Sequence, residues 1–355
     1  MLSPLARYTG IWQGEDALER RWMRELFGPY LREEVVDPAR ELVPEHAIVF
    51  EHFANAQDPA IYAKFRGRDA ILVDLSDENY EFRPEIYTNF RGVVRPYGSG
   101  VFRAETVKVI PLGYTSACVA SEGTGLPASE REYAWSFVGQ GKKSSRPEMV
   151  RSLRRVEPHL LFITDALRGV AMWNRGREGR ERRYDPAANS RVLTQTVFSP
   201  CPMGNTNLES FRLYESLESG CIPLVETRPG LEYFTRLFGP HPLPSFRRWR
   251  QAAEFVAKTV NDAAAVDALQ QECAAWWSAY KQRLREELGE FLTQRSADER
   301  VLPVEAFVTP RALQRGFAVR ELLRHHNLPA LLRRVSLMAG RLLRREPRRV
   351  HRGAK

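Results

Sequence analysis

The residues with the clearest chemical potential lie between positions 196 and 226, in the segment TVFSPCPMGNTNLESFRLYESLESGCIPLVE. An apolar strand leads into a Pro/Gly/Asn loop, a helical stretch, a Gly-Cys turn and a second apolar strand, which is the order of a βαβ unit. The first turn of a helix leaves backbone N–H groups without partners and carries partial positive charge. We therefore predict an anion site near Asn207, with the helix beginning around Leu208, and a diphosphate would suit it.

Four side chains of this segment are candidate ligands for a nucleotide diphosphate. Ser210, in the first predicted turn, can offer a hydroxyl to phosphate, and Arg212 carries a planar, permanently charged fork. Glu215 is placed to accept hydrogen bonds from ribose hydroxyls, and Asn205 lies in the preceding loop. The alternative is an ordinary surface helix on which Arg212 and Glu215 form an i, i+3 ion pair.

A second candidate phosphate-binding element is the segment FVGQGKKSSR, residues 137–146. A predicted strand ends at Gly139, and Lys143 and Arg146 follow before a predicted helix, so flexible backbone and cations meet there. A second lysine stands where the P-loop consensus requires Ser or Thr, which excludes an ATPase of that kind. We expect Gly139, Lys143 and Arg146 to bind the same diphosphate, with a plain surface cation as the alternative for Arg146.

The run SFRLYESLESGCIPLV, residues 210–225, resembles the exostosin-like (GT47-type) glycosyltransferases, in which SxRxxEA is followed by GCIPVI. Ser216 stands in the usual place of Ala. Within that family the chain looks most like the ribitol xylosyltransferase branch. Three further segments and a helix have counterparts there: the CPxG turn at 201–204, IPLGY at 110–114, AWSFVGQGKKSSRPEMVRSL at 134–153 and WWSAYKQRLREEL at 276–288. The resemblance runs from about residue 50 to 291 and is weak before Lys108.

The resemblance implies a GT-B fold, with an N-terminal acceptor domain, a C-terminal donor domain and inversion at the sugar carbon. We hypothesise that a UDP-sugar is the donor, gripped by Ser210, Arg212 and Glu215, and that a hexosyl or pentosyl unit moves to an acceptor hydroxyl. The sequence has no DxD pair of the kind that holds a metal in GT-A enzymes, so we expect no obligatory cofactor. A retaining GT-B enzyme and a non-catalytic nucleotide-sugar-binding protein remain the alternatives.

An inverting transfer needs a base that removes the proton of the acceptor hydroxyl. Two apolar runs of the N-terminal half end in suitable residues: DLSDE ends in Asp77 and Glu78, and AIVFEH ends in Glu51 and His52. The carboxyl ends of parallel strands are where sites collect. These four residues are alternative base candidates, and a helix cap or a salt bridge is the competing role for each carboxylate.

Strand-like and helix-like segments alternate on both sides of a small, polar stretch between residues 120 and 132. This pattern predicts an α/β protein with two Rossmann-like domains facing a cleft. We set the acceptor-side domain at 1–125 and the nucleotide-sugar-binding domain at 126–262. A long amphipathic helix packing across the domains is predicted at 263–300, and a basic helical tail at 301–355. We also expect helices beginning at about Gly14 and at Asp58, and a solvated loop at 175–183.

The formal charge of +9 is concentrated at the C-terminus, where residues 311–355 hold thirteen Arg and Lys against two acids. The rest of the chain is near neutral, which argues against a nucleic-acid partner. The tail combines arginines with leucines, so we expect peripheral contact with a membrane; an exposed or partner-packed helix is the alternative. With no signal peptide or spanning segment, the expected location is cytoplasmic, and the acceptor a surface glycan or glycolipid. The four cysteines form no CxxC pair and are expected to be small buried residues.

Overall fold

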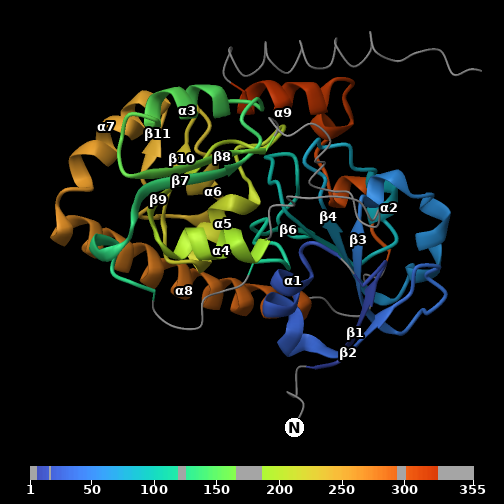
Figure 1. The fold of residues 1–355 in the computed structure, drawn as a ribbon. Helices are drawn as coiled ribbons and strands as arrows, with labels where there is room; N and C mark the ends of the chain where they lie inside the picture. Colours follow the sequence, from blue (N-terminus) through green and yellow to red (C-terminus); the bar gives the residue numbers. More distant parts are fainter. Residues whose placement is uncertain (1–5, 16, 119–124, 165–185, 294–300, 327–355) are drawn as a thin grey trace, which may run out of the picture.

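The computed structural model describes residues 6–15, 17–118, 125–164, 186–293 and 301–326, which form two α/β lobes (Figure 1). The N-terminal lobe holds a six-stranded parallel sheet in the order β2-β1-β3-β4-β5-β6. Its strands are β1 (Tyr8–Trp12), β2 (Leu31–Val36), β3 (His46–His52), β4 (Asp69–Leu75), β5 (Gly92–Arg95) and β6 (Val107–Val109). The C-terminal lobe holds a five-stranded parallel sheet in the order β11-β10-β9-β7-β8. Its strands are β7 (Tyr133–Gly139), β8 (His159–Ile163), β9 (Thr196–Cys201), β10 (Ile222–Glu226) and β11 (Ser245–Phe246).

Helices flank both sheets and connect their parallel strands. The α-helices are α1 (Arg20–Phe27), α2 (Pro84–Tyr87), α3 (Arg146–Leu153), α4 (Pro186–Thr194), α5 (Phe211–Glu218), α6 (Tyr233–Phe238), α7 (Trp249–Thr259), α8 (Ala263–Thr293) and α9 (Phe317–His325). Short 3₁₀ turns complete the chain: η1 (Gly28–Tyr30), η2 (Ala54–Ala56), η3 (Pro59–Phe65), η4 (Ala128–Glu130), η6 (Val304–Ala306) and η7 (Pro310–Leu313). The predicted α/β architecture with two parallel sheets is confirmed.

The central strands are apolar along their whole length because both faces of each sheet are covered. The five middle residues of β3 and all six residues of β9 are buried. Such strands appear in the sequence as apolar runs, which is why β3, β4, β7, β9 and β10 match predicted strands. All four cysteines are buried, as expected.

The long helix α8 runs beneath both lobes (Figure 1). Its Trp277 ring stacks on Trp22 of α1 at a centroid distance of 5.8 Å. The Lys281 ammonium lies 3.0 Å from the Glu25 carboxylate of α1 and 2.8 Å from the Glu218 carboxylate of α5. One helix therefore holds an N-terminal and a C-terminal helix in a fixed relation.

The segment after α8 returns to the junction of the lobes. Val308 bridges to Phe102 of the N-terminal lobe. At the end of α9, the His325 carbonyl accepts a hydrogen bond from Arg228 Nε at 2.9 Å. Burial lowers the pKa of His325 to about 3, so its ring is neutral and its Nδ1 can accept from the backbone N–H of Leu208.

Two parts of the predicted architecture cannot be compared with the structure. The charged loop at 175–183 and the leucine-rich part of the basic tail after residue 326 lie outside the described residues. Within the part of the chain that the structure describes, no helix has the length and apolarity to cross a bilayer.

The structure corrects three predicted helix starts. The helix expected from about Gly14 begins at Arg20 as α1, after a segment of bends and turns. The segment after Asp58 forms the 3₁₀ turn η3, with Asp58 accepting from Ala60 N at 3.0 Å, rather than an α-helix. The helix predicted from Leu208 begins at Phe211, with Ser210 in extended conformation at its N-cap. The side-chain oxygen of Asn207 accepts from Glu209 N at 3.0 Å, and this local turn delays the helix.

A buried group of charges lies at the carboxyl end of the N-terminal sheet. Arg95 is fully buried, with its guanidinium 2.8 Å from Asp77 and 3.7 Å from Asp74. Tyr87 donates to Asp74 at 2.6 Å. Burial raises the pKa of Asp74 to about 7, with the nearby Asp77 adding to the rise and Arg95 opposing it.

This raised pKa predicts how stability depends on pH. The folded protein keeps the Asp74 proton between about pH 4 and 7, where the unfolded chain has lost it, so the free energy of unfolding falls as pH rises through that window. Asp74→Asn should make the loss in free energy of unfolding between pH 5 and 8 smaller, by on the order of a few kcal/mol. Urea unfolding of wild type and variant at both pH values measures it, and equal slopes in the two proteins would contradict the assignment.

Candidate functional site

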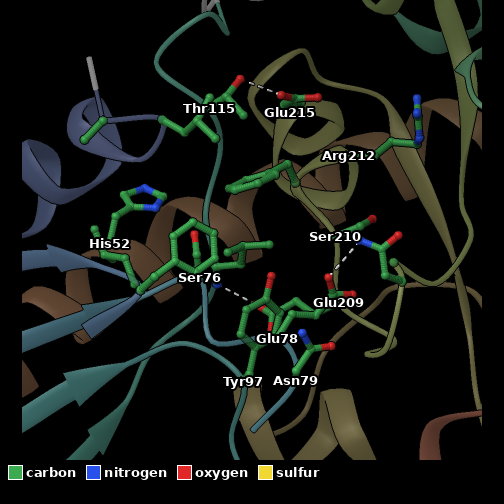
Figure 2. Close-up of a pocket in the computed structure, with 18 of the residues that line it drawn as sticks. His52, Ser76, Glu78, Asn79, Tyr97, Thr115, Glu209, Ser210, Arg212 and Glu215 are labelled. Carbon is green, nitrogen blue, oxygen red and sulfur yellow. Dashed lines mark hydrogen bonds between the residues drawn. The ribbon is translucent and has the colours of Figure 1, made fainter. Parts of the chain in front are cut away.

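A cavity of about 820 Å³ lies between the lobes, at the carboxyl ends of strands from both sheets. Its size falls in the range of small-molecule sites. Figure 2 shows His52 and Ser76 on one side of it, and Ser210 and Arg212 on the other. Nine of the eleven candidate residues from the sequence line this cavity: His52, Glu78, Gly139, Lys143, Arg146, Asn205, Ser210, Arg212 and Glu215. Asp77 and Glu51 do not.

Arg212 and Arg146 flank one aromatic ring at the C-terminal wall of the cavity. Their guanidinium carbons lie 4.3 Å and 5.8 Å from the centre of the Phe137 ring. Arg212 Nη2 donates to the Val138 carbonyl at 2.7 Å, and Arg146 Nη1 donates to the Gln140 carbonyl at 3.0 Å. These contacts orient two delocalised cations beside the loop that follows β7.

Gly139, at the end of β7, is required by this arrangement. Its φ of +149° is unfavourable for residues with a side chain, and a Cβ there would lie only 3.0 Å from Arg212 Nη2. The next turn brings Lys143 to the cavity, and Ser144 donates to the Gly204 carbonyl at 2.6 Å. The two predicted phosphate-binding segments are thus hydrogen-bonded to each other.

Ser210 stands at the N-cap of α5, one residue before the helix rather than in its first turn. Its Oγ is buried and has no hydrogen-bond partner among the described residues, although N-cap serines usually accept from the helix backbone. A buried hydroxyl without a partner is costly, so a ligand oxygen in the cavity would satisfy it.

Glu215 lies one and a half turns further along α5 and faces Thr115, as Figure 2 shows. Thr115 Oγ1 donates to Glu215 Oε1 at 2.8 Å. This hydrogen bond holds one carboxylate oxygen of a cavity-lining residue in place, and no Arg212–Glu215 ion pair is formed among the described residues. The ion-pair alternative for these two side chains does not apply.

The predicted anion site near Asn207 is occupied by a carboxylate of the protein itself. Glu78, from the N-terminal lobe, accepts from the backbone N–H groups of Thr206 at 2.7 Å and Asn207 at 3.3 Å. The Asn205 amide donates to it as well, at 3.1 Å. These amides do bind an anion, but that anion is the carboxylate of Glu78, which links the two lobes.

His52 forms a hydrogen-bonded chain with two residues of the N-terminal lobe. Its Nε2 lies 2.5 Å from Glu19 Oε2, and Ser76 donates to Glu19 Oε1 at 2.9 Å. Glu19 is fully buried, whereas the His52 side chain is 19% exposed and lines the cavity. With Nε2–H donating to the carboxylate, Nδ1 carries the lone pair, which is the arrangement of a carboxylate-oriented general base.

Strained backbone surrounds this histidine. Phe53, Ser76 and Tyr97 line the cavity and have φ values of 57°, 65° and 61°, a region that non-glycine residues seldom adopt. Such strain persists where the surrounding structure fixes it, and it gathers at functional sites.

The structure gives the remaining two base candidates other partners. Glu51 is fully buried and forms a two-pronged ion pair with Arg40, whose Nε lies 2.9 Å from Glu51 Oε2. Asp77 is fully buried against Arg95 and accepts from Glu81 N at 2.8 Å. Neither side chain reaches the cavity, so the salt-bridge alternative describes both.

Two buried carboxylates, one behind the cavity wall and one lining the cavity, were not predicted from the sequence. One is Glu19, which orients His52. The other is Glu209, a buried carboxylate that accepts from Leu112 N and from the hydroxyls of Tyr214 and Tyr233. Burial raises its pKa. Its partners come from both halves of the chain, so no local pattern could have indicated it.

Comparisons with known proteins agree with this geometry. A crystal structure of an α1,3-fucosyltransferase superposes with a TM-score of 0.51 at 11% identity, covering 83% of this chain and 92% of that one. Anabaena Alr3699/HepE in complex with UDP gives 0.46 at 10% identity, covering 81% and 100%, and T4 phage BGT in complex with UDP and Mn²⁺ gives 0.44 at 10%, covering 81% and 99%. No curated protein sequence matches the chain. The fold is GT-B.

The family model described as the RXYLT1 C-terminal domain matches residues 114–297. This range covers more than half of the 355 residues and contains Gly139, Lys143, Arg146, Ser210, Arg212 and Glu215. It also agrees with the resemblance of residues 210–225 to the exostosin-like ribitol xylosyltransferases. The chain therefore belongs to the RXYLT1 C-terminal domain family.

Proposed function

We propose that the protein is a glycosyltransferase that moves a sugar from a UDP-sugar to an acceptor hydroxyl with inversion. The observation that carries this proposal is the division of one cavity between two kinds of chemistry. The C-terminal wall carries three cations and the Ser210 hydroxyl, which has no hydrogen-bond partner among the described residues, and a carboxylate-oriented imidazole lies on the N-terminal wall. Family membership supports the donor class.

In the proposed reaction His52 Nδ1 removes the proton of the acceptor hydroxyl as its oxygen attacks the anomeric carbon. The bond from that carbon to the diphosphate breaks on the opposite face, which inverts the configuration. Arg212, Arg146 and Lys143 stabilise the charge that grows on the leaving diphosphate. The Glu19 carboxylate, hydrogen-bonded to Nε2, stabilises the imidazolium that His52 becomes.

The rest of the donor is held by α5. Glu215 accepts hydrogen bonds from the ribose hydroxyls, and Ser210 donates to a phosphate oxygen. The transferred unit is a hexosyl or pentosyl group, and the acceptor belongs to a surface glycan or glycolipid. We further propose that the enzyme works in the cytoplasm, with the basic residues after 311 in contact with the inner membrane face.

Ligand-induced thermal stabilisation tests the donor assignment. UDP should raise the melting temperature of the wild type, and Glu215→Ala should weaken UDP binding by roughly 10- to 100-fold, because hydrogen bonds to a charged acceptor contribute about 1.5–3 kcal/mol. The matched control is Glu254→Ala, on the surface of α7, where Glu254 pairs only with exposed Arg250 among the described residues. This control should keep the full shift.

Two outcomes would count against the assignment. If no nucleoside diphosphate shifts the wild-type melt, the cavity is not a donor site. If Glu215→Ala shifts as far as the control does, the ribose is held elsewhere. Release of UDP from a UDP-sugar in wild type then separates an enzyme from a protein that only binds the nucleotide sugar.

A further inference from the structure

Residues 78–80 of the N-terminal lobe pair with residues 205–207 of the C-terminal lobe. Glu78 accepts from this loop as described above, and Figure 2 shows it with Asn79 below Glu209. Two side-chain hydrogen bonds extend the pairing: Thr206 Oγ1 with Asn79 Oδ1 at 2.9 Å, and Asn207 Nδ2 with the Tyr80 hydroxyl at 2.7 Å. These contacts join the lobes residue by residue, and we call the two segments together the interlobe clamp.

The loop stays bound from outside its own lobe up to the start of α5. Leu208, which follows the clamp, donates its backbone N–H to His325 Nδ1 of α9. The Glu209 carboxylate accepts from the backbone N–H of Leu112, which precedes the second lobe in the chain. The next residue is Ser210, which caps α5 and lines the cavity. The position of this donor-site residue therefore depends on residues outside the lobe that carries it.

The N-terminal half of the clamp is a strained turn that follows β4. Ser76 and Tyr80, at its two ends, have φ values of 65° and 55°. Between them, the Asp77 carboxylate accepts from a backbone N–H of the same segment at 2.8 Å and pairs with the buried Arg95 guanidinium at 2.8 Å. Strain of this kind persists only where the surrounding structure fixes the backbone. The Asp77–Arg95 pair thus holds the turn that presents Glu78 to the other lobe.

We propose that residues 78–80 are a positioning element for the donor site, and that Glu78 is its main positioning residue. Its carboxylate holds the loop at 205–207 in the conformation in which Ser210 and α5 bind the nucleotide diphosphate. A loop without this acceptor would have to be ordered when the donor binds, and that cost lowers the apparent affinity. The inference rests on the proposed function and adds that donor affinity is set from the opposite lobe.

The Kd for UDP, measured by calorimetric titration, tests the positioning role. Glu78→Ala should raise this Kd about tenfold, the factor expected if about one molecule in ten still holds the loop in its binding conformation. The matched control is Glu81→Ala. The Glu81 side chain is exposed and does not line the cavity, and the backbone N–H that it donates to Asp77 is kept in the variant. This control should bind UDP like wild type.

Glu78→Gln separates positioning from base catalysis. A glutamine keeps one oxygen that accepts from the backbone N–H groups of Thr206 and Asn207, and the Asn205 amide can rotate to offer its own oxygen to the new NH₂ group. The Kd for UDP should therefore return to within about threefold of the wild-type value. If Glu78 were the base, the same variant would lower kcat by at least about 100-fold and leave the Kd unchanged.

Tyr80→Phe tests the clamp without touching Glu78. It removes the hydroxyl that accepts from Asn207 and keeps the buried ring, so the variant should fold. We expect the Kd for UDP to rise about threefold, since one neutral hydrogen bond to the loop is lost. Circular dichroism of each variant checks that it is folded, and Tyr80→Phe decides the question if Glu78→Ala is not.

The outcomes separate this inference from the proposed function. If UDP binds wild type, but Glu78→Ala and Tyr80→Phe bind it as tightly as Glu81→Ala does, the donor site stands and the positioning element is wrong. A large loss of kcat in Glu78→Gln at an unchanged Kd would also overturn the inference, because Glu78 would then be the base. If UDP does not bind wild type, the proposed function itself has failed, and the positioning element fails with it.

Discussion

Replacing His52 with alanine is expected to lower kcat for sugar transfer by roughly 10²- to 10⁴-fold, the usual contribution of a positioned general base. The reason is that His52 lies on the N-terminal wall and is oriented by the buried Glu19, whose Oε2 lies 2.5 Å from His52 Nε2, whereas the Glu78 carboxylate is already bound by backbone N–H groups. The Kd for UDP should change little, because the nucleotide groups are assigned to the opposite wall. Initial rates at saturating donor and a separate UDP titration measure the two quantities.

The chain offers a control on the same strand. His46 begins β3 and His52 ends it, so His46→Ala makes the same change at the opposite edge of the sheet, where Nδ1 of His46 pairs with Asp69 at 2.9 Å. It should keep the wild-type kcat. Glu19→Gln should lower kcat less than His52→Ala does, with KM for the donor unchanged, because it removes the charge that orients His52 and leaves the imidazole. If His52→Ala kept the wild-type kcat, His52 would not be the base. Glu78 would then be the remaining candidate on this wall, or the reaction would be retaining.

The fold was predictable for strands that are buried on both faces, because their burial shows in the sequence as a continuous run of apolar residues. Strands β3 and β9 are covered on both faces, so they read as continuous apolar runs. Strands β1 and β2 carry weaker signals and were not predicted. β2 is an edge strand with the exposed charged sequence LREE, and β1 contains Gly10, where a Cβ would lie 3.2 Å from Leu31.

The two walls of the cavity also differ in how far the sequence predicts them. Ser210, Arg212 and Glu215 lie within six residues of one βαβ unit, so their spacing alone predicts that they share a wall of the cavity. Choosing a base was harder, because Glu51 and His52 are neighbours whose side chains point to opposite faces of β3. Which face meets the cavity depends on Arg40 on one side and Glu19 on the other, and neither contact is visible in the sequence.

The loop before α5 offers backbone amides whose partner could not be predicted from that segment alone. The sequence predicts a helix start near Asn207 that binds a diphosphate, whereas in the structure the helix begins at Phe211 and the Asn207 amide donates to a carboxylate. That carboxylate comes from Glu78, about 130 residues earlier in the chain, at an approach so close that a Cβ on Gly204 would lie 2.6 Å from Glu78 Oε1. Local donors predict that an anion binds there, but only the packed lobes determine which anion it is.

Arg212→Ala is expected to reduce kcat/KM for transfer by roughly 10²- to 10³-fold, the cost of removing a preorganised donor from developing transition-state charge. Its guanidinium is already held against the Phe137 ring and the Val138 carbonyl, so it needs no reorganisation when the diphosphate leaves. Arg212→Lys keeps the charge but loses the planar fork, and it should fall between wild type and alanine. Arg151→Ala, which changes an exposed residue on α3 of the same lobe, should leave kcat/KM unchanged. The contrary outcome is that Arg212→Ala transfers sugar at the wild-type rate while its circular dichroism shows that it is folded. In that case Arg146 and Lys143 alone would stabilise the charge on the leaving diphosphate, and α5 would only bind the nucleoside.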